Sequence, residues 1–256
     1  MQETISDHEQ QETSPFKTLE LKNAPEIQNY FDWANPMLRV TWDETTTPEE
    51  YRPDYIVTHP DETVVLGVYE DQTLVAGGKV TILSDEEKKR LEPNTELHSE
   101  KSALLEYVAV KEESRNKHIL LDLIERRTKW AEDHGVKYLY SELELDNPIS
   151  SVPKVHNGFK MYSVHQSGAG ISTPYLVLRK NLSETTVKTE SPETTATEKK
   201  EILVTEDSYD ELAHLFEDGW VGVDITIDKP IKTVDQISPD EIQAPWKLTL
   251  ERAPQE

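Results

Sequence analysis

The sequence contains no cysteine, and this absence removes several classes of chemistry at once. A chain without cysteine has no disulfide framework, no thiolate nucleophile and no cysteine-based zinc site. Such a composition is typical of proteins from a reducing compartment, and we expect a cytoplasmic location. The histidine and carboxylate residues show no metal-ligand spacing, so no metal site is expected either.

Positive charge is also scarce, with 27 lysine and arginine residues against 50 aspartate and glutamate residues. The formal net charge of −23 disfavours binding to nucleic acid or to an anionic membrane surface, because both require a cationic face. An acidic protein attracts cations, which favours an amine-bearing small molecule or a basic protein or peptide as partner. No apolar run has the length of a membrane span, and the polar N-terminus does not resemble a signal peptide.

Two low-complexity stretches divide the chain. Residues 1–15 and 183–200 are rich in threonine, serine and glutamate, which predicts a disordered lead and a flexible linker. Between them lies a main domain at 16–182, and a small acidic α+β segment follows at 201–256. In that last segment Ser208 is expected to cap a short helix.

The apolar pattern of the main domain predicts a mixed α/β fold, a central twisted sheet flanked by helices. Two β-rich runs separated by Asp71 and Gln72 indicate a hairpin, and Gly77-Gly78 in its second strand suggests a bulge or a close backbone approach. The apolar run 103–110 predicts a strand buried on both faces, followed by a long helix that stops at Gly135. A strand after that helix would be its parallel neighbour. The expected elements are a helix at 24–38, strands at 63–70 and 73–83, a short helix within 84–101, the strand at 103–110, the long helix, and strands at 136–145, 158–164 and 173–180.

The turn between the 103–110 strand and the long helix is unusual because it contains no glycine. A buried strand, a short turn and a helix is an arrangement that holds phosphate groups, and glycine lets backbone N–H groups approach them closely. Here the segment RNKHILLDLIERRTKWAEDHG at 115–135 begins with charged and polar side chains instead. The sequence leaves open whether this turn still binds a phosphate-bearing ligand.

This order of elements resembles the GNAT superfamily of acyl-CoA-dependent N-acyltransferases over roughly residues 60–180. The family signature is a strand ending in valine, a loop of the form Arg/Gln-x-x-Gly-x-Gly/Ala, and the helix that the loop opens. EYVAV-KEES-RNKHILLDLI occupies that place, with Val110 ending the strand and Arg115 opening the loop. His118 and Leu120 stand where the two glycines belong.

The later part of the family signature is also present in altered form. Asn147 and the pair Gly158-Phe159 fall at the family's separation, and Lys154 stands where the family has a tyrosine. The resemblance therefore implies a GNAT-like fold with the small α+β segment attached at its C-terminal side.

The resemblance also implies a site for acetyl-CoA or another acyl-CoA as co-substrate. Glu106 is the implied general base, and its apolar neighbours on the strand are expected to raise its pKa. Lys154 or Tyr162 would protonate the departing thiolate in place of the missing tyrosine. The residues implied to contact acyl-CoA are Val108, Val110, Arg115, Asn116, Lys117, His118 and Asn147.

Two functions remain open at this stage. The first is an N-acetyltransferase-like protein that transfers an acyl group, most simply acetyl, directly to an amine. The second is a GNAT-fold protein without catalytic activity that serves as a regulatory or protein-interaction module, with its acidic C-terminal segment docking a basic partner. The missing loop glycines and the missing tyrosine are the features that motivate the second function.

Overall fold

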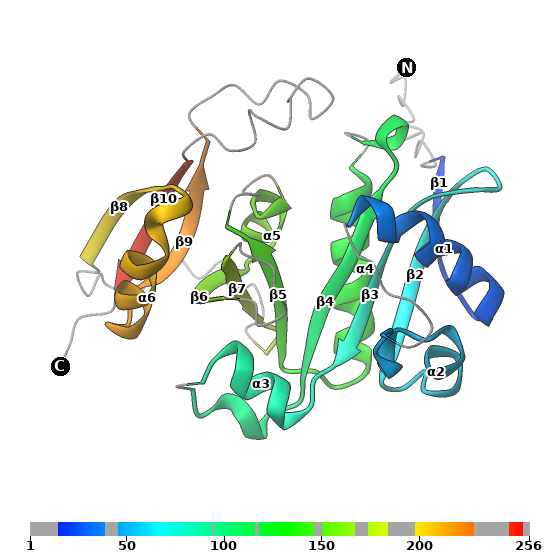
Figure 1. The fold of residues 1–256 in the computed structure, drawn as a ribbon, viewed down its shortest axis with the longest axis horizontal. Coiled ribbons are helices and arrows are strands. Elements are labelled where there is room, and N and C mark those ends of the chain that lie inside the picture. Colours follow the sequence, from blue (N-terminus) through cyan, green and yellow to red (C-terminus); the bar gives the residue numbers. More distant parts are fainter. Residues whose placement is uncertain are drawn as a thin grey trace, which may run out of the picture.

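A computed structural model of the chain describes residues 15–38, 46–93, 95–115, 118–145, 150–166, 174–183, 198–227 and 246–252. Its strands form one sheet in the order β1-β2-β3-β4-β5-β7-β6-β9-β10-β8 (Figure 1). The predicted lead and linker lie largely outside the described residues. The elements are β1 (Phe16–Glu20), α1 (Ala24–Met37), η1 (Glu49–Tyr51), α2 (Pro53–Thr58), β2 (Thr63–Glu70), β3 (Thr73–Ile82), α3 (Asp85–Leu91), β4 (Ser102–Val110), α4 (Ile119–Asp133), β5 (Tyr138–Glu144), α5 (Val152–His156), β6 (Lys160–Gln166), β7 (Pro174–Asn181), β8 (Glu198–Val204), α6 (Tyr209–Glu217), β9 (Val221–Thr226) and β10 (Trp246–Arg252).

Strands β4 and β5 are parallel neighbours, as the long helix between them predicted. The other pairs in the sheet are antiparallel, including the predicted hairpin β2–β3 and the predicted final pair β6–β7. Helix α4 ends where expected, because Gly135 adopts a left-handed conformation with φ of 70°. The predicted mixed α/β fold is confirmed, while β1 and α2 were not anticipated.

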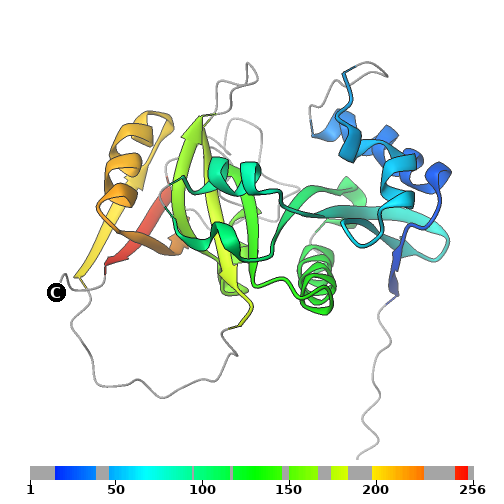
Figure 2. The same cartoon turned by 90° about the horizontal axis from the view of Figure 1, so that it is seen from below.

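Helices cover both faces of the sheet. Helix α4 lies on one side and α1 and α2 lie on the other, as the two views show (Figures 1 and 2). The residues of one strand alternate between these sides. In β5, for example, Leu139 and Leu143 belong to the large core that includes α4, whereas Tyr140 packs with Leu91 at the end of α3.

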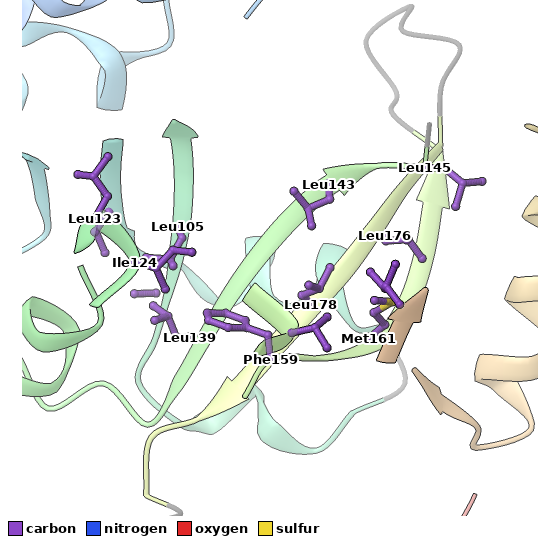
Figure 3. Close-up of a cluster of buried hydrophobic side chains, with 14 of the residues drawn as sticks. Leu105, Leu123, Ile124, Leu139, Leu143, Leu145, Phe159, Met161, Leu176 and Leu178 are labelled. Carbon is purple, nitrogen blue, oxygen red and sulfur yellow. The ribbon is translucent and has the colours of Figure 1, made fainter. Parts of the chain in front are cut away.

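The C-terminal strands continue this sheet. Strand β9 pairs with β6 at Gly222 and Met161, and a Cβ at position 222 would lie 2.9 Å from the Cβ of Met161. The indole N–H of Trp246 donates a buried hydrogen bond of 3.1 Å to the carbonyl of Leu145, just after β5. Figure 3 shows Leu145 and Met161 in the large core, to which Trp246 also belongs.

Helix α6 of this C-terminal part follows the prediction except at its cap. Ser208 stands at the N-cap position, but its hydroxyl accepts a hydrogen bond from the Thr205 N–H at 2.9 Å and does not cap α6. A short 3-10 turn at Glu206–Ser208 precedes the helix and directs the Ser208 side chain back to the preceding residues. Ser208 is therefore the N-cap residue, as predicted, but its side chain does not supply a capping hydrogen bond.

Replacing Trp246 with phenylalanine tests whether the C-terminal strands unfold together with the rest of the sheet. The change leaves the buried Leu145 carbonyl without its donor, and we expect a loss of about 1–3 kcal/mol in one cooperative transition. Urea unfolding followed by far-UV circular dichroism measures it. Trp220→Phe, at a half-buried position on the same segment, is the control and should cost less. A second, separate transition would show that β8, β9 and β10 unfold independently.

Candidate active site

Strand β4 is buried on both faces only in its first half, whereas the sequence predicted burial along its whole length. It pairs with β5 from Ser102 to Leu105, where Leu105 lies opposite Ser141, and from Glu106 onward its residues are mostly half-buried. The two strands diverge beyond this point (Figure 1). Over residues 106–110, within the described part of the chain, the backbone edge of β4 that faces β5 has no strand partner.

A bulge in β4 accompanies the divergence. Tyr107 has a φ of 56°, and the β3–β4 register shifts between Gly77 and Lys79. The Tyr30 hydroxyl of α1 donates to the Tyr107 carbonyl, which fixes the bulge from one face of the sheet. A Cβ at Gly77 would lie 2.4 Å from the Tyr30 ring. The bulge and close approach predicted at the two glycines are therefore confirmed.

The Glu106 carboxylate accepts hydrogen bonds from three side chains. Lys79 Nζ and Thr81 Oγ1 donate to its Oε1 at 2.8 and 2.7 Å, and the Tyr51 hydroxyl donates to its Oε2. Burial alone would raise the pKa of Glu106, but the charge of Lys79 and these hydrogen bonds outweigh it and lower the pKa. The expectation of a raised pKa was wrong, because apolar strand neighbours do not reveal a partner on the adjacent strand.

A second charged cluster lies on the same face of β5. Glu142 accepts hydrogen bonds from both terminal nitrogens of Arg90 at 2.8 and 2.9 Å, and its Oε1 lies 2.7 Å from His165 Nε2. Burial and the nearby Arg90 lower the pKa of His165, although Glu142 acts in the opposite direction. A neutral imidazole at this position is able to accept a proton.

Lys154 lies on the opposite face, at the point where β4 and β5 separate. Its ammonium nitrogen donates to Ser141 Oγ at 2.7 Å, and Ser141 Oγ donates to the Leu105 carbonyl at 3.2 Å. The residue is 5 % exposed. Burial and the charge of Arg127 lower the pKa of Lys154 to about 7, which makes this amine an acid or base suited to neutral pH.

Tyr162 does not lie with Lys154 on the same face of the sheet. The Arg179 guanidinium stacks on the Tyr162 ring at 3.7 Å, and Arg179 also pairs with Glu92 at the end of α3. Tyr140 contacts Glu92 on that face, whereas its neighbour Ser141 points to Lys154 on the other face. The two residues proposed as alternative proton donors are thus separated by the sheet.

His118, the residue directly before α4, has a backbone conformation that favours glycine. His118 adopts a left-handed conformation with φ of 58°, the region that favours glycine, and it stands at the helix N-cap. Leu120 packs half-buried against the large core, and Arg115 is also half-buried. Val108 and Val110 lie on the diverging part of β4. Three further predicted contact residues, Asn116, Lys117 and Asn147, lie outside the described residues.

Replacing His118 with glycine is expected to stabilise the protein by about 0.5–1 kcal/mol. A left-handed non-glycine residue costs about 1–2 kcal/mol, and the greater freedom of glycine in the unfolded chain cancels part of the gain. Thermal or urea unfolding measures the difference. His118→Ala is the control, because it removes the imidazole but keeps the strained backbone. Equal stabilities of the glycine and alanine variants would contradict this explanation.

Sequence reasoning missed several residues of this site. Ser141, His165 and Tyr51 give no signal in the sequence, since each joins the site only through tertiary contacts. Lys79 gives a weak signal, because it interrupts an otherwise apolar strand. Arg127 gives a stronger one, because it occupies a position on the buried stripe of α4, and the structure finds it completely buried.

Two further properties concern the described part of the chain. None of its helices is both long and apolar enough to cross a bilayer. The same residues contain no group of three or more histidine and carboxylate side chains arranged to hold a metal ion.

Comparisons with known proteins bear on these features. Residues 27–151 match the model of the acetyltransferase (GNAT) family. None of the curated proteins matches the chain significantly. Among solved structures, FeeM, an N-acyl amino acid synthase from uncultured soil microbes, is 12 % identical and has a TM-score of 0.51, covering 66 % of this chain and 92 % of its own.

Two more solved structures align over a similar part of the chain. The protein yncA from Salmonella typhimurium, solved with its cofactor acetyl-CoA, is 14 % identical with a TM-score of 0.49, covering 69 % of this chain and 99 % of its own. A ribosomal-protein-alanine N-acetyltransferase from Brucella melitensis is 19 % identical with a TM-score of 0.48, covering 65 % and 99 %. The family match confirms the resemblance inferred from the sequence: residues 27–151 are similar to the GNAT acetyltransferase family.

Proposed function

We propose that the protein is an acyl-CoA-dependent N-acyltransferase that transfers an acyl group directly to an amine. The observation that carries this proposal is the divergence of β4 from β5 after Leu105, together with the bulge at Tyr107. The divergence leaves backbone donors and acceptors of β4 available to an extended ligand. The match to the GNAT family supports acyl transfer from CoA as the class of chemistry.

The residues present are compatible with an acyl-CoA donor. The free edge of β4 at Val108 and Val110 would bind the amide groups of the donor's extended arm. The N-terminus of α4 would hold its phosphates through backbone N–H groups, and His118 at the N-cap has the left-handed backbone that a glycine would adopt. Half-buried Leu120 packs against the large core.

Lys154 would act as the proton donor in this reaction. Acyl-CoA supplies an activated thioester, and a positioned acid of suitable pKa assists the departure of the thiolate. Lys154 lies beside the last β4–β5 pair through Ser141, where the family tyrosine would otherwise stand. Ser141 Oγ accepts a hydrogen bond from the Lys154 amine and donates one to the Leu105 carbonyl, which holds the amine in place.

The acceptor amine would approach from the opposite face, between Glu106 and Glu142. Both carboxylates are held by cationic or hydroxyl donors, so they shape the electrostatic environment of the acceptor. Glu106 carries a negative charge at neutral pH, which suits a cationic amine. His165 beside Glu142 is a better proton acceptor than Glu106, because a carboxylate with a lowered pKa is a weak base.

Isothermal titration calorimetry with acetyl-CoA, longer acyl-CoAs and free CoA is the first test. Binding of at least one of them is expected, and ADP serves as the control that lacks the extended arm. A screen of amine acceptors that detects the released thiol then tests transfer itself. Failure of every acyl-CoA to bind at millimolar concentration would contradict the proposed function.

The second function, a GNAT-fold module without transfer activity, is favoured by one observation. Histidine and leucine replace both loop glycines, and Leu120 contributes to the core. Binding of acyl-CoA without turnover of any amine, in the wild type and in His118→Gly alike, would favour this alternative. A gain in CoA affinity and activity in His118→Gly would instead indicate an acyltransferase with a weakened donor loop.

A further inference from the structure

Arg127 is a buried cation without a matching anion. The residue is fully buried on α4, and its Nε donates to the Leu123 carbonyl of the same helix at 3.1 Å. Its Nη1 and Nη2 have no hydrogen-bond partner in the described part of the chain. Burying a charge without a partner costs folding free energy, so a functional role for Arg127 would explain why it is present.

The sheet makes room for the Arg127 guanidinium. Gly78 lies against it, and a Cβ at that position would stand 2.9 Å from Nη1. Val108 of β4 lies beside the same spot, since its Cγ2 would be 3.1 Å from that Cβ. The guanidinium therefore sits directly behind the β4 bulge, on the face of the sheet that also carries Lys154.

The Lys154 amine lies near the same strand as the Arg127 guanidinium. Lys154 Nζ donates to Ser141 Oγ, which reaches the Leu105 carbonyl of β4, and the guanidinium lies beside Val108 of β4. Within the described part of the chain, Arg127 is the charged residue of α4 that acts on Lys154, and β5 contributes the neutral Ser141 hydroxyl. Strand β9 packs on α5 with a single ionisable residue, Asp224, which is exposed, and His156 on α5 itself is exposed as well. None of the described carboxylates offsets the effect of Arg127 on the amine.

We propose that Arg127 is a positioning residue whose buried charge controls the protonation of the Lys154 amine. Two cations that share one buried region destabilise each other's charged forms. Arg127 keeps its proton because guanidinium is the stronger base, so Lys154 is the residue that loses its proton. The proposal rests on the assignment of Lys154 as the proton donor of the proposed function.

The chemical consequence is a stronger acid at the thiolate. The acceptor nitrogen forms a C–N bond to the acyl carbon as the acyl–sulfur bond breaks, and it releases one proton to water. The Lys154 ammonium gives one proton to the thiolate sulfur, so an N–H bond breaks and an S–H bond forms. The neutral Lys154 amine then takes up one proton from water, which balances the proton that the acceptor released. Arg127 promotes the first transfer because it disfavours the charged ammonium, and it does so without contacting the substrate.

A purely structural role for Arg127 makes different predictions. If Arg127 served only to form its hydrogen bond to Leu123 and to pack on Gly78, removing its charge would destabilise the protein. The titration of Lys154 would then stay unchanged. If its charge is the purpose, a methionine of similar length removes a buried unpaired cation, and the protein should remain folded. Only the second role moves the titration of Lys154.

The test is a direct titration of Lys154 by NMR of ¹⁵N-labelled lysine side chains. Lys154→Met identifies the resonance, and the wild type should titrate near pH 7. In Arg127→Met the midpoint should rise by about one pH unit or more, because one of the two buried cations is gone. Arg126→Met, which removes an exposed charge from the same helix, is the control and should change nothing.

The outcomes separate this proposal from the proposed function. An unchanged Lys154 midpoint in folded Arg127→Met would overturn the proposal. If Arg127→Met does not fold, Arg127→Gln provides the same comparison with a neutral polar side chain. The titration requires no acyl-CoA, so its result stands even if the protein transfers no acyl group. With an active enzyme, the alkaline limb of the pH–rate profile should move in the same direction.

Discussion

Replacement of Lys154 with methionine is expected to lower kcat by about 10²-fold or more while leaving acyl-CoA affinity nearly unchanged. Loss of a positioned general acid typically costs 10²–10⁴-fold, and Lys154 contacts Ser141 rather than the backbone edge of β4 where the donor would bind. Steady-state kinetics and calorimetry on the same preparation measure both quantities. A fall in affinity with kcat unchanged would show that Lys154 binds the donor and does not transfer a proton.

The stability of the same variant gives an independent check. Because the pKa of Lys154 falls to about 7 on folding, the unfolded chain binds more protons than the folded one between pH 7 and about 10. Wild-type stability should therefore rise with pH across that window, and the rise should disappear in Lys154→Met. At neutral pH the variant should be no less stable than wild type, since it no longer buries an ionisable amine. Urea unfolding of both proteins between pH 7 and about 10 measures these stabilities. A rise that persists in Lys154→Met, or a variant less stable than wild type at neutral pH, would contradict the prediction.

Replacement of Lys79 with methionine is expected to destabilise the protein by about 3–5 kcal/mol at neutral pH. The change leaves the Glu106 carboxylate largely buried with only its hydroxyl donors, and an unpaired buried charge is costly. Urea unfolding measures the loss. Lys89→Met, at an exposed position on α3, is the matched control and should change stability by less than about 0.5 kcal/mol.

The pH dependence of this loss has a definite sign. In the wild type the pKa of Glu106 is lowered, so its stabilising contribution is present above the unfolded pKa of about 4.3 and is lost as pH falls through the folded value. Without Lys79 burial would dominate and raise the pKa of Glu106. The penalty should then shrink as the pH falls toward 4, because the carboxylate becomes neutral.

A double variant separates the pair from its parts. Lys79→Met combined with Glu106→Leu removes both charges, and replacing a buried ion pair by apolar side chains is often close to neutral. The double variant should therefore recover much of the stability lost by Lys79→Met alone. A double variant that is less stable than the single one would show that Glu106 stabilises the sheet by itself.

Much of the fold could be predicted from the sequence because local patterns encode it. Helix α4 shows its periodicity and its stop at Gly135, and the hairpin β2–β3 shows its turn between two β-rich runs. The parallel pair β4–β5 follows from the helix that must connect its strands. Edge strand β1 and short helix α2 carry patterns too brief to recognise.

The roles of Glu106 and Lys154 in acyl transfer stay predictions that the resemblance implies. The pKa of each depends on residues far away in the chain. Lys79 lowers the pKa of Glu106, and Arg127 lowers that of Lys154. Neither effect can be inferred from neighbours along the chain, because electrostatic interactions depend on distance in space.

The sequence by itself determined that this chain folds as a GNAT-like domain, since hydrophobic periodicity and turn residues act locally. It also determined that the loop before α4 lacks its glycines and that a lysine replaces the family tyrosine. Only the tertiary structure decided that His118 adopts a left-handed backbone, that β8, β9 and β10 complete the sheet, and that a buried arginine lowers the pKa of the lysine. These properties arise where distant segments pack together, and the energies involved depend on burial and separation, which the order of residues alone does not specify.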